Sequence, residues 1–67
     1  MVRDTSERRQ LILEVLSDRR EEKVEALAFE FQVSEKTIRR DIKILSLTAP
    51  IFAVRGRYGG GIFIADG

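Results

Sequence analysis

Between Ser34 and Leu45 the sequence gathers the side chains most suited to bind another molecule. This segment combines two hydroxyl groups with four cations: Ser34, Thr37, Lys36, Arg39, Arg40 and Lys43. Arg and Lys donate hydrogen bonds to phosphates and to base edges, so these residue types suit the major groove of DNA. The same charges would also suit a solvated helix surface, and this segment alone leaves both interpretations open.

The apolar residues of this segment predict a helix. Ile38, Ile42 and Leu45 stand at positions i, i+4 and i+7, which places one stripe against a core. Ser34 precedes the stripe and can cap the helix, because its hydroxyl can accept a hydrogen bond from an amide of the first turn. We therefore expect a helix over residues 35–46.

The directions of the other side chains around this helix follow from a rotation of about 100° per residue. The side opposite the apolar stripe, which we call the free side, carries Lys36, Arg40 and Lys43. Arg39 lies on one flank of the helix, and Thr37 and Ile44 lie on the other. The expected helix therefore has one apolar side and one cationic side.

The composition excludes several classes of protein. The chain has 67 residues, enough for one small domain over residues 1–67, and its 43% hydrophobic content argues against disorder. It contains neither cysteine nor histidine, which rules out disulfides, thiolate or imidazole metal ligands, and catalysis by Ser-His-Asp or Cys-His sets. We therefore expect no enzyme activity, no cofactor and no metal site.

Carboxylates are scattered among Lys and Arg, where pairing at the surface is the expected role. Asp41 differs, because it lies beside the apolar stripe of its helix. We expect it to form an ion pair at the edge of the core, with a partner that the sequence does not identify.

The net charge of +1 hides an asymmetry along the chain. Residues 1–31 carry six Lys/Arg against eight Asp/Glu, whereas residues 32–67 carry six against three. The positive excess coincides with the cationic helix, as expected for the footprint of a nucleic-acid-binding protein. With no apolar run of membrane-spanning length and no signal peptide, we expect a cytoplasmic protein with no membrane partner.

The first part of the chain predicts another helix, from Thr5 to Ser17. Asp4 and Glu7 have the D-x-x-E spacing of a capping box. The apolar side is expected to comprise Ile12, Val15 and Leu16, widened by Leu11 and Leu13, with Arg8, Arg9 and Glu14 outside. Residues 18–23 contain no apolar side chain and are expected to form a polar turn.

A second short helix should start near Val24. Apolar residues follow at i, i+3, i+4 and i+7: Val24, Leu27, Ala28 and Phe31. Only Gln32 and Val33 separate this helix from Ser34, so the two helices must cross at a large angle, as in a helix-turn-helix over about residues 22–45. Gln32 stands where such turns often need a left-handed backbone, at a cost of about 1 kcal/mol for a residue other than glycine.

Phe29 points away from the apolar stripe of this second helix. It either packs against the first helix within the monomer or contacts a partner.

Two β-favouring runs follow Pro50, at residues 51–55 and 61–65, with a glycine-rich connection between them. This pattern predicts a β-hairpin with Arg57 and Tyr58 at its tip and Arg55 at its base. A phosphate-binding loop is excluded, since no Lys-Ser/Thr pair and no helix follow the glycines. Because the hairpin comes directly after a helix-turn-helix, we favour a DNA-contacting wing over a plain hairpin with a solvated tip.

The segment F-x-V-S-x-x-T-I-R-R-D-I-x-x-L, from Phe31 to Leu45, together with Leu27-Ala28, resembles the DeoR-type winged helix-turn-helix pattern. Pro50-Ile51, Gly56 and Gly59-Gly60 are similar to the wing of the same broad group, which includes the DNA-binding modules of WYL-type regulators and biotin-repressor proteins. The resemblance covers about residues 7–64. It implies a mainly α fold with a small β-hairpin, a three-helix winged helix-turn-helix with a two-stranded wing, and a bacterial transcription regulator whose third helix enters the major groove.

The resemblance also implies DNA contacts by Ser34, Thr37, Arg39 and Arg40. The helical geometry adds Lys36 and Lys43, and the hairpin adds Arg55, Arg57 and Tyr58. The expected partner is double-stranded DNA. Full-length DeoR-type repressors usually add a large sugar-phosphate-binding domain, which these residues do not include, so no small-molecule effector is expected to act on them.

A single copy with this small net charge should bind DNA weakly, so we expect a homodimer, formed through Phe29 or through residues beyond Gly67. The alternative function is a winged-helix adaptor that contacts proteins and not DNA. The free side of the third helix separates these functions, because it is cationic here and would more often be apolar in an adaptor.

Overall fold

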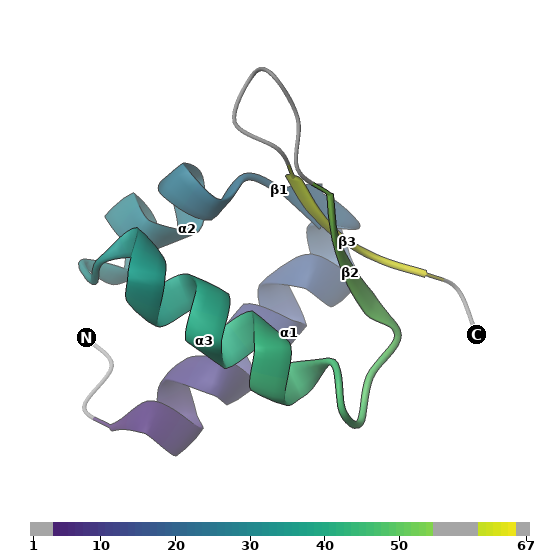
Figure 1. Cartoon of the computed structure of the whole chain (residues 1–67), viewed down its shortest axis with the longest axis horizontal. Coiled ribbons are helices and arrows are strands. Elements are labelled where there is room, and N and C mark those ends of the chain that lie inside the picture. The colour runs from purple at the N-terminus through teal and green to yellow at the C-terminus, as the bar shows by residue number, and fades with distance from the viewer. Residues whose placement is uncertain (1–3, 55–60, 66–67) are drawn as a thin grey trace.

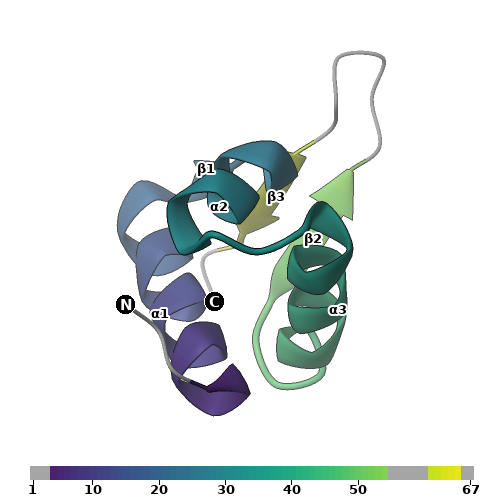
Figure 2. The same ribbon diagram turned by 90° about the vertical axis from the view of Figure 1, so that its left-hand side faces the viewer.

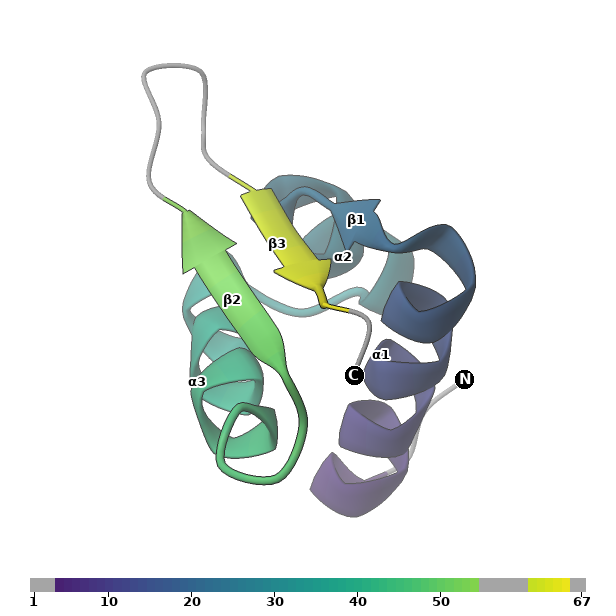
Figure 3. The ribbon, with the colours of Figure 1, turned by 90° about the vertical axis from the view of Figure 1, so that its right-hand side faces the viewer.

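The computed structural model describes residues 4–54 and 61–65. Its elements are α1 (Thr5–Arg19), β1 (Glu21–Glu22), α2 (Val24–Phe31), α3 (Glu35–Leu45), β2 (Ile51–Val54) and β3 (Gly61–Ile64). The small sheet lies against one side of the helices, with α3 beside β2 and α1 beside β1 (Figures 1 and 3). Figure 2 shows α1 and α3 side by side, with α2 lying across one end of the pair. This is the predicted winged helix-turn-helix.

Helix α1 begins where the sequence predicted and ends two residues later. The Asp4 carboxylate caps it by accepting a hydrogen bond of 2.8 Å from the amide of Glu7. Arg20 ends the helix in a backbone conformation with φ of 73°, and its amide donates to the Leu16 carbonyl at 2.7 Å. A positive φ at a residue with a Cβ is sterically unfavourable, so the hydrogen bonds around Arg20 must hold this turn.

The expected polar turn over residues 18–23 is wrong at four positions, because its first two residues belong to α1 and two others form a strand. Glu21 and Glu22 form strand β1, which pairs antiparallel with Phe63 and Ile62 of β3. The sheet therefore has three strands in the order β1-β3-β2, where the sequence had predicted a two-stranded wing. A strand of two glutamates shows no hydrophobic alternation, and only the tertiary proximity of β3 provides its hydrogen-bond partners.

The predicted hairpin is confirmed by the register of the other two strands. Ile51 pairs with Ile64, Phe52 with Phe63, Ala53 with Ile62, and Val54 with Gly61, all antiparallel. Strand β2 is described over Ile51–Val54, and the predicted residue 55 lies outside the described residues. Strand β3 ends at Ile64, one residue earlier than predicted.

The turn between α2 and α3 uses the left-handed conformation expected at Gln32. Its φ is 57° and its ψ is 46°, and its amide donates to the Ala28 and Phe29 carbonyls at the end of α2. The amide of Val33 donates to the same Ala28 carbonyl at 3.0 Å. These bonds satisfy backbone acceptors that the helix end would otherwise leave unpaired. Helix α3 then begins at Glu35, as predicted, and ends at Leu45, one residue earlier than predicted.

One core joins the helices to the sheet. Its buried side chains are Ile12 and Leu16 of α1, Val24, Leu27 and Ala28 of α2, Ile38 and Ile42 of α3, Ile51 of β2 and Ile62 of β3. The predicted apolar sides of the helices are confirmed, although Val15, Phe31 and Leu45 are only half-buried at the margin of the core.

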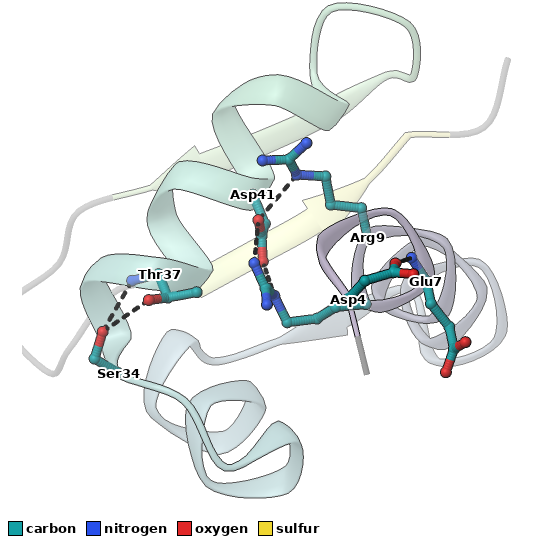
Figure 4. Close-up of polar contacts among 7 residues, drawn as sticks. Asp4, Glu7, Arg9, Ser34, Thr37 and Asp41 are labelled. Carbon is teal, nitrogen blue, oxygen red and sulfur yellow. Dashed lines mark hydrogen bonds and ion pairs between the residues drawn. The ribbon is translucent and has the colours of Figure 1, made fainter. Parts of the chain in front are cut away.

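A polar contact inside this core joins α3 to α1. The side chain of Asp41 is fully buried, and Arg8 donates to it from Nε at 2.5 Å and from Nη2 at 3.1 Å. Arg9 donates from its own Nε to the same carboxylate at 2.9 Å (Figure 4). The expected ion pair of Asp41 is thus present. The expectation that Arg8 and Arg9 stay outside is wrong, since both are half-buried against α3.

The signal for this contact was present in the sequence. Arg8 stands four residues before Ile12 and Arg9 three residues before it, so both lie on the side of α1 that faces the core. Their long apolar stems can follow the core while their guanidinium groups reach Asp41.

The two guanidinium groups also set the charge state of Asp41. Burial by itself would raise the pKa of this carboxyl, but the hydrogen bonds and positive charges of Arg8 and Arg9 outweigh burial and lower the pKa below its usual value. Asp41 is therefore ionised at neutral pH.

We expect Asp41→Asn to destabilise the fold by about 1–3 kcal/mol, because it removes the carboxylate that pairs two half-buried guanidinium groups. Urea unfolding at pH 7 measures this loss. Asp18→Asn, the same change at an exposed carboxylate of α1, is the matched control and should cost much less. Equal effects of the two substitutions would contradict the structural role of Asp41.

The stabilisation by ionised Asp41 should depend on pH. Since its pKa is lowered in the folded state, the stabilisation is complete above the unfolded pKa of about 3.9 and is lost as the pH falls through the folded pKa. The difference in free energy of unfolding between the natural chain and Asp41→Asn should therefore be constant from about pH 7 to 5 and shrink below about pH 4. A difference that stays constant to pH 2 would show that ionisation of Asp41 is not the cause.

Candidate nucleic-acid interface

Helix α3 presents its cationic side to solvent. Ile38, Asp41 and Ile42 face inward and are buried. The side chains of Lys36, Arg40 and Lys43 are exposed on the opposite side. Within the described part of the chain, no ion pair or side-chain hydrogen bond occupies these three cations. They are therefore available to bind an anionic ligand.

The beginning of α3 is fixed by two hydroxyl groups. Ser34 Oγ accepts a hydrogen bond from the amide of Thr37 at 3.1 Å, and the two side-chain oxygens lie 3.0 Å apart (Figure 4). Ser34 thus caps the helix as predicted. Both residues lie at the positive end of the helix dipole, where an anion is stabilised.

Arg39 differs from the other cations of α3. It lies on the flank and donates from Nη2 to the Glu35 carboxylate, one turn earlier, at 3.1 Å. Both side chains remain largely exposed. The structure thus brings together Ser34, Lys36, Thr37, Arg39, Arg40 and Lys43 on one helix, with Glu35 as a neighbour that the sequence reasoning did not select.

The predicted wing residues Arg55, Arg57 and Tyr58 lie outside the described residues. The two strands that precede and follow them are antiparallel, and Val54 and Gly61 face each other at the end of the ladder. Strand β2 runs antiparallel to α3, so its Val54 end lies toward the beginning of α3 (Figures 2 and 3).

The sheet carries an apolar outer side that the sequence reasoning missed. The rings of Phe52 and Phe63 stack across β2 and β3 with their centroids 5.5 Å apart, and Phe52 and Val54 are each about half exposed. The alternation of residues along β2 was the available signal, because Ile51 is buried and its neighbour Phe52 points to the other side.

The two possibilities for Phe29 are resolved in part. Its side chain is 88% exposed, so the hypothesis that it packs against α1 is wrong. A contact between Phe29 and a partner stays a hypothesis.

The acidic half of the chain forms a different part of the surface. Arg19 donates to Glu22 at the start of the sheet and to Glu30 on α2, both at 2.9 Å. These contacts neutralise one carboxylate of β1 and one of α2 with a cation of α1.

Neither a metal site nor a membrane-spanning helix is present in the described ranges, 4–54 and 61–65. No group of three His, Cys, Asp or Glu residues there is arranged to hold a metal ion. No helix in the same ranges has both the length and the apolar character required to cross a membrane.

Comparison with known proteins gives one match. The family model described as the DeoR-like helix-turn-helix domain matches residues 8–64. Searches of curated proteins and of solved structures returned no match. The matched range starts in α1 and runs to the end of β3, so it includes every element that builds the core and positions α3. By this match and by its fold, the chain belongs to the DeoR-like helix-turn-helix family.

Proposed function

We propose that this protein binds double-stranded DNA in a sequence-specific manner as a transcription regulator, with α3 in the major groove. The observation that carries this proposal is the exposed row of Lys36, Arg40 and Lys43 opposite the buried Ile38 and Ile42. A helix of this width fits the major groove, where its cations meet phosphates and base edges. Membership of the DeoR-like family supports the same function.

The proposed contacts follow the position of each residue on the interface. Ser34 and Thr37 would approach a phosphate or a base at the beginning of α3, and the cations of the free side would neutralise phosphates and read bases. Arg55, Arg57 and Tyr58 would contact the flanking minor groove or the backbone. This last part of the proposal is based on the sequence and on the position of the hairpin beside α3.

An adaptor that binds only proteins is less consistent with α3. On its free surface the exposed large apolar residue is Ile44, and its neighbours are charged. An interface between proteins usually excludes Lys from its core. The cationic surface of α3 therefore favours DNA.

The active species that we propose is a homodimer on DNA. One module of this size buries only about 600–1,000 Å² on DNA, so two copies reading half-sites about 34–36 Å apart would gain affinity and discrimination. Phe29 supplies an exposed aromatic side chain for pairing. A Phe side chain offers about 200 Å², far less than the roughly 800 Å² per partner of a stable interface. Pairing should therefore be weak without DNA.

We expect Arg40→Ala to weaken DNA binding without unfolding the protein, because Arg40 lies opposite the buried stripe. If Arg40 reads a base, the loss should be about 1–3 kcal/mol and the preference at one position should relax. Thermal unfolding and duplex affinity are measured on the same preparation. Lys23→Ala, which removes an exposed cation at the start of α2, is the control and should change affinity less.

A large loss of stability in Arg40→Ala with unchanged affinity would show that the interface lies elsewhere. The affinity of the natural chain should also fall steeply with salt, since each neutralised phosphate releases a counterion. Absence of duplex binding at low salt would reject the proposed function.

We expect Phe29→Glu to reduce cooperative binding to a duplex with two half-sites by about tenfold or more, since burial of a Phe is worth about 1.5–3 kcal/mol. Light scattering with and without duplex gives the stoichiometry. Leu47→Glu is the matched control, because Leu47 is 80% exposed and lies on another segment. A one-to-one complex of nanomolar affinity that Phe29→Glu leaves unchanged would contradict pairing through α2.

A further inference from the structure

Glu35 is the exposed carboxylate of α3, in a helix whose free side is otherwise cationic. Asp41, the other acidic residue of α3, is buried against Arg8 and Arg9. The Glu35 side chain is 48% exposed and lies in the first turn of the helix. Its position is informative because the N-terminal residues of a recognition helix are those that contact base edges.

The stability of the fold does not explain this carboxylate. Its ion pair with Arg39 joins two exposed side chains at positions i and i+4, and such pairs contribute little because water and salt screen them. The helix is already capped by Ser34. An acid in the first turn adds only a modest favourable interaction with the helix dipole.

Near DNA the Glu35 carboxylate would have two effects, one on affinity for all sequences and one on the choice between bases. It is repelled by every phosphate, so it lowers affinity for all sequences alike. In the major groove it can accept a hydrogen bond from the exocyclic amine of cytosine, which is the usual base partner of Glu. A carboxylate on a helix in the major groove therefore lowers affinity for all sequences and increases discrimination between bases.

The ion pair extends this effect to Arg39. A guanidinium group carries five N–H donors in a fixed plane, and Arg39 uses one of its nitrogens on Glu35. The remaining donors can meet O6 and N7 of guanine. Held by Glu35, the guanidinium is less free to turn toward a phosphate, which would read no sequence.

We propose that Glu35 is a specificity-determining residue, which accepts a hydrogen bond from a cytosine amine and orients Arg39 toward a guanine of the same or the adjacent base pair. This inference rests on the proposed function, since it requires α3 to lie in the major groove. It adds a residue whose charge opposes non-specific binding, and it assigns Arg39 to base reading.

The test is selection from a random duplex pool with the full 67-residue chain and its variants. The natural chain should enrich a motif containing a cytosine and a nearby guanine. In Glu35→Gln the preferred base at the cytosine position should change to adenine, because Gln pairs with the adenine N6 and N7 atoms. Arg39→Ala should lose the preference for guanine.

Glu35→Ala gives a second, independent measurement. It should lose the preference at the cytosine position, while its affinity for unrelated duplex should rise about fivefold at low salt, the effect of one charge about 4 Å from a phosphate in water. Glu25→Ala, the same change in the first turn of α2, should leave the motif and the affinity unchanged. Unfolding temperatures of all variants verify that the fold is retained.

The outcomes separate this inference from the proposed function. If the natural chain enriches a motif and Glu35→Gln and Glu35→Ala enrich the same one, the role of Glu35 is rejected and DNA binding stands. If the natural chain binds no duplex, the proposed function fails and the role of Glu35 fails with it.

Discussion

The buried carboxylate of Asp41 requires partners, because an ionised group enclosed by apolar side chains is strongly destabilised unless it is hydrogen-bonded and neutralised. Arg8 and Arg9 of α1 meet this requirement with three hydrogen bonds. Ile38 and Ile42 would tolerate some rotation of α3, since apolar contact has no direction. The fixed geometry of two guanidinium groups on one carboxylate restricts that rotation far more. The orientation of α3 thus depends on this contact.

The composition of the candidate interface follows from this orientation. With Asp41 directed at α1, the opposite side of α3 must carry Lys36, Arg40 and Lys43 into solvent. Glu35 and Arg39 lie on the flank, where they can contact each other and still reach a ligand. A rotation of one residue position would bring Thr37 or Ile44 toward the centre of the surface and change the groups that α3 presents to solvent. The salt bridge in the core and the chemistry of the surface are therefore coupled through a single rigid helix.

Most of the large exposed apolar side chains lie on other elements. Phe29 is on α2, Phe52 and Val54 are on β2, and Leu47 follows α3. The proposed DNA contact through the cationic side of α3 would therefore leave Phe29 and the outer side of the sheet exposed.

The sequence by itself determined the helices, their apolar sides, the left-handed turn at Gln32, the hairpin pairing and the cationic side of α3, because each depends on local periodicity, capping or backbone preference. It did not predict β1, since a two-residue strand of glutamates exists only where β3 supplies its partners. It also predicted Arg8 and Arg9 outside, because charged side chains usually lie at the surface, although their spacing from Ile12 puts them on the core side of α1. The tertiary structure decided which guanidinium groups contact Asp41 and showed that Phe29 does not pack against α1. It also showed the ion pair between Glu35 and Arg39. Each of these depends on distances between side chains, which periodicity alone does not determine.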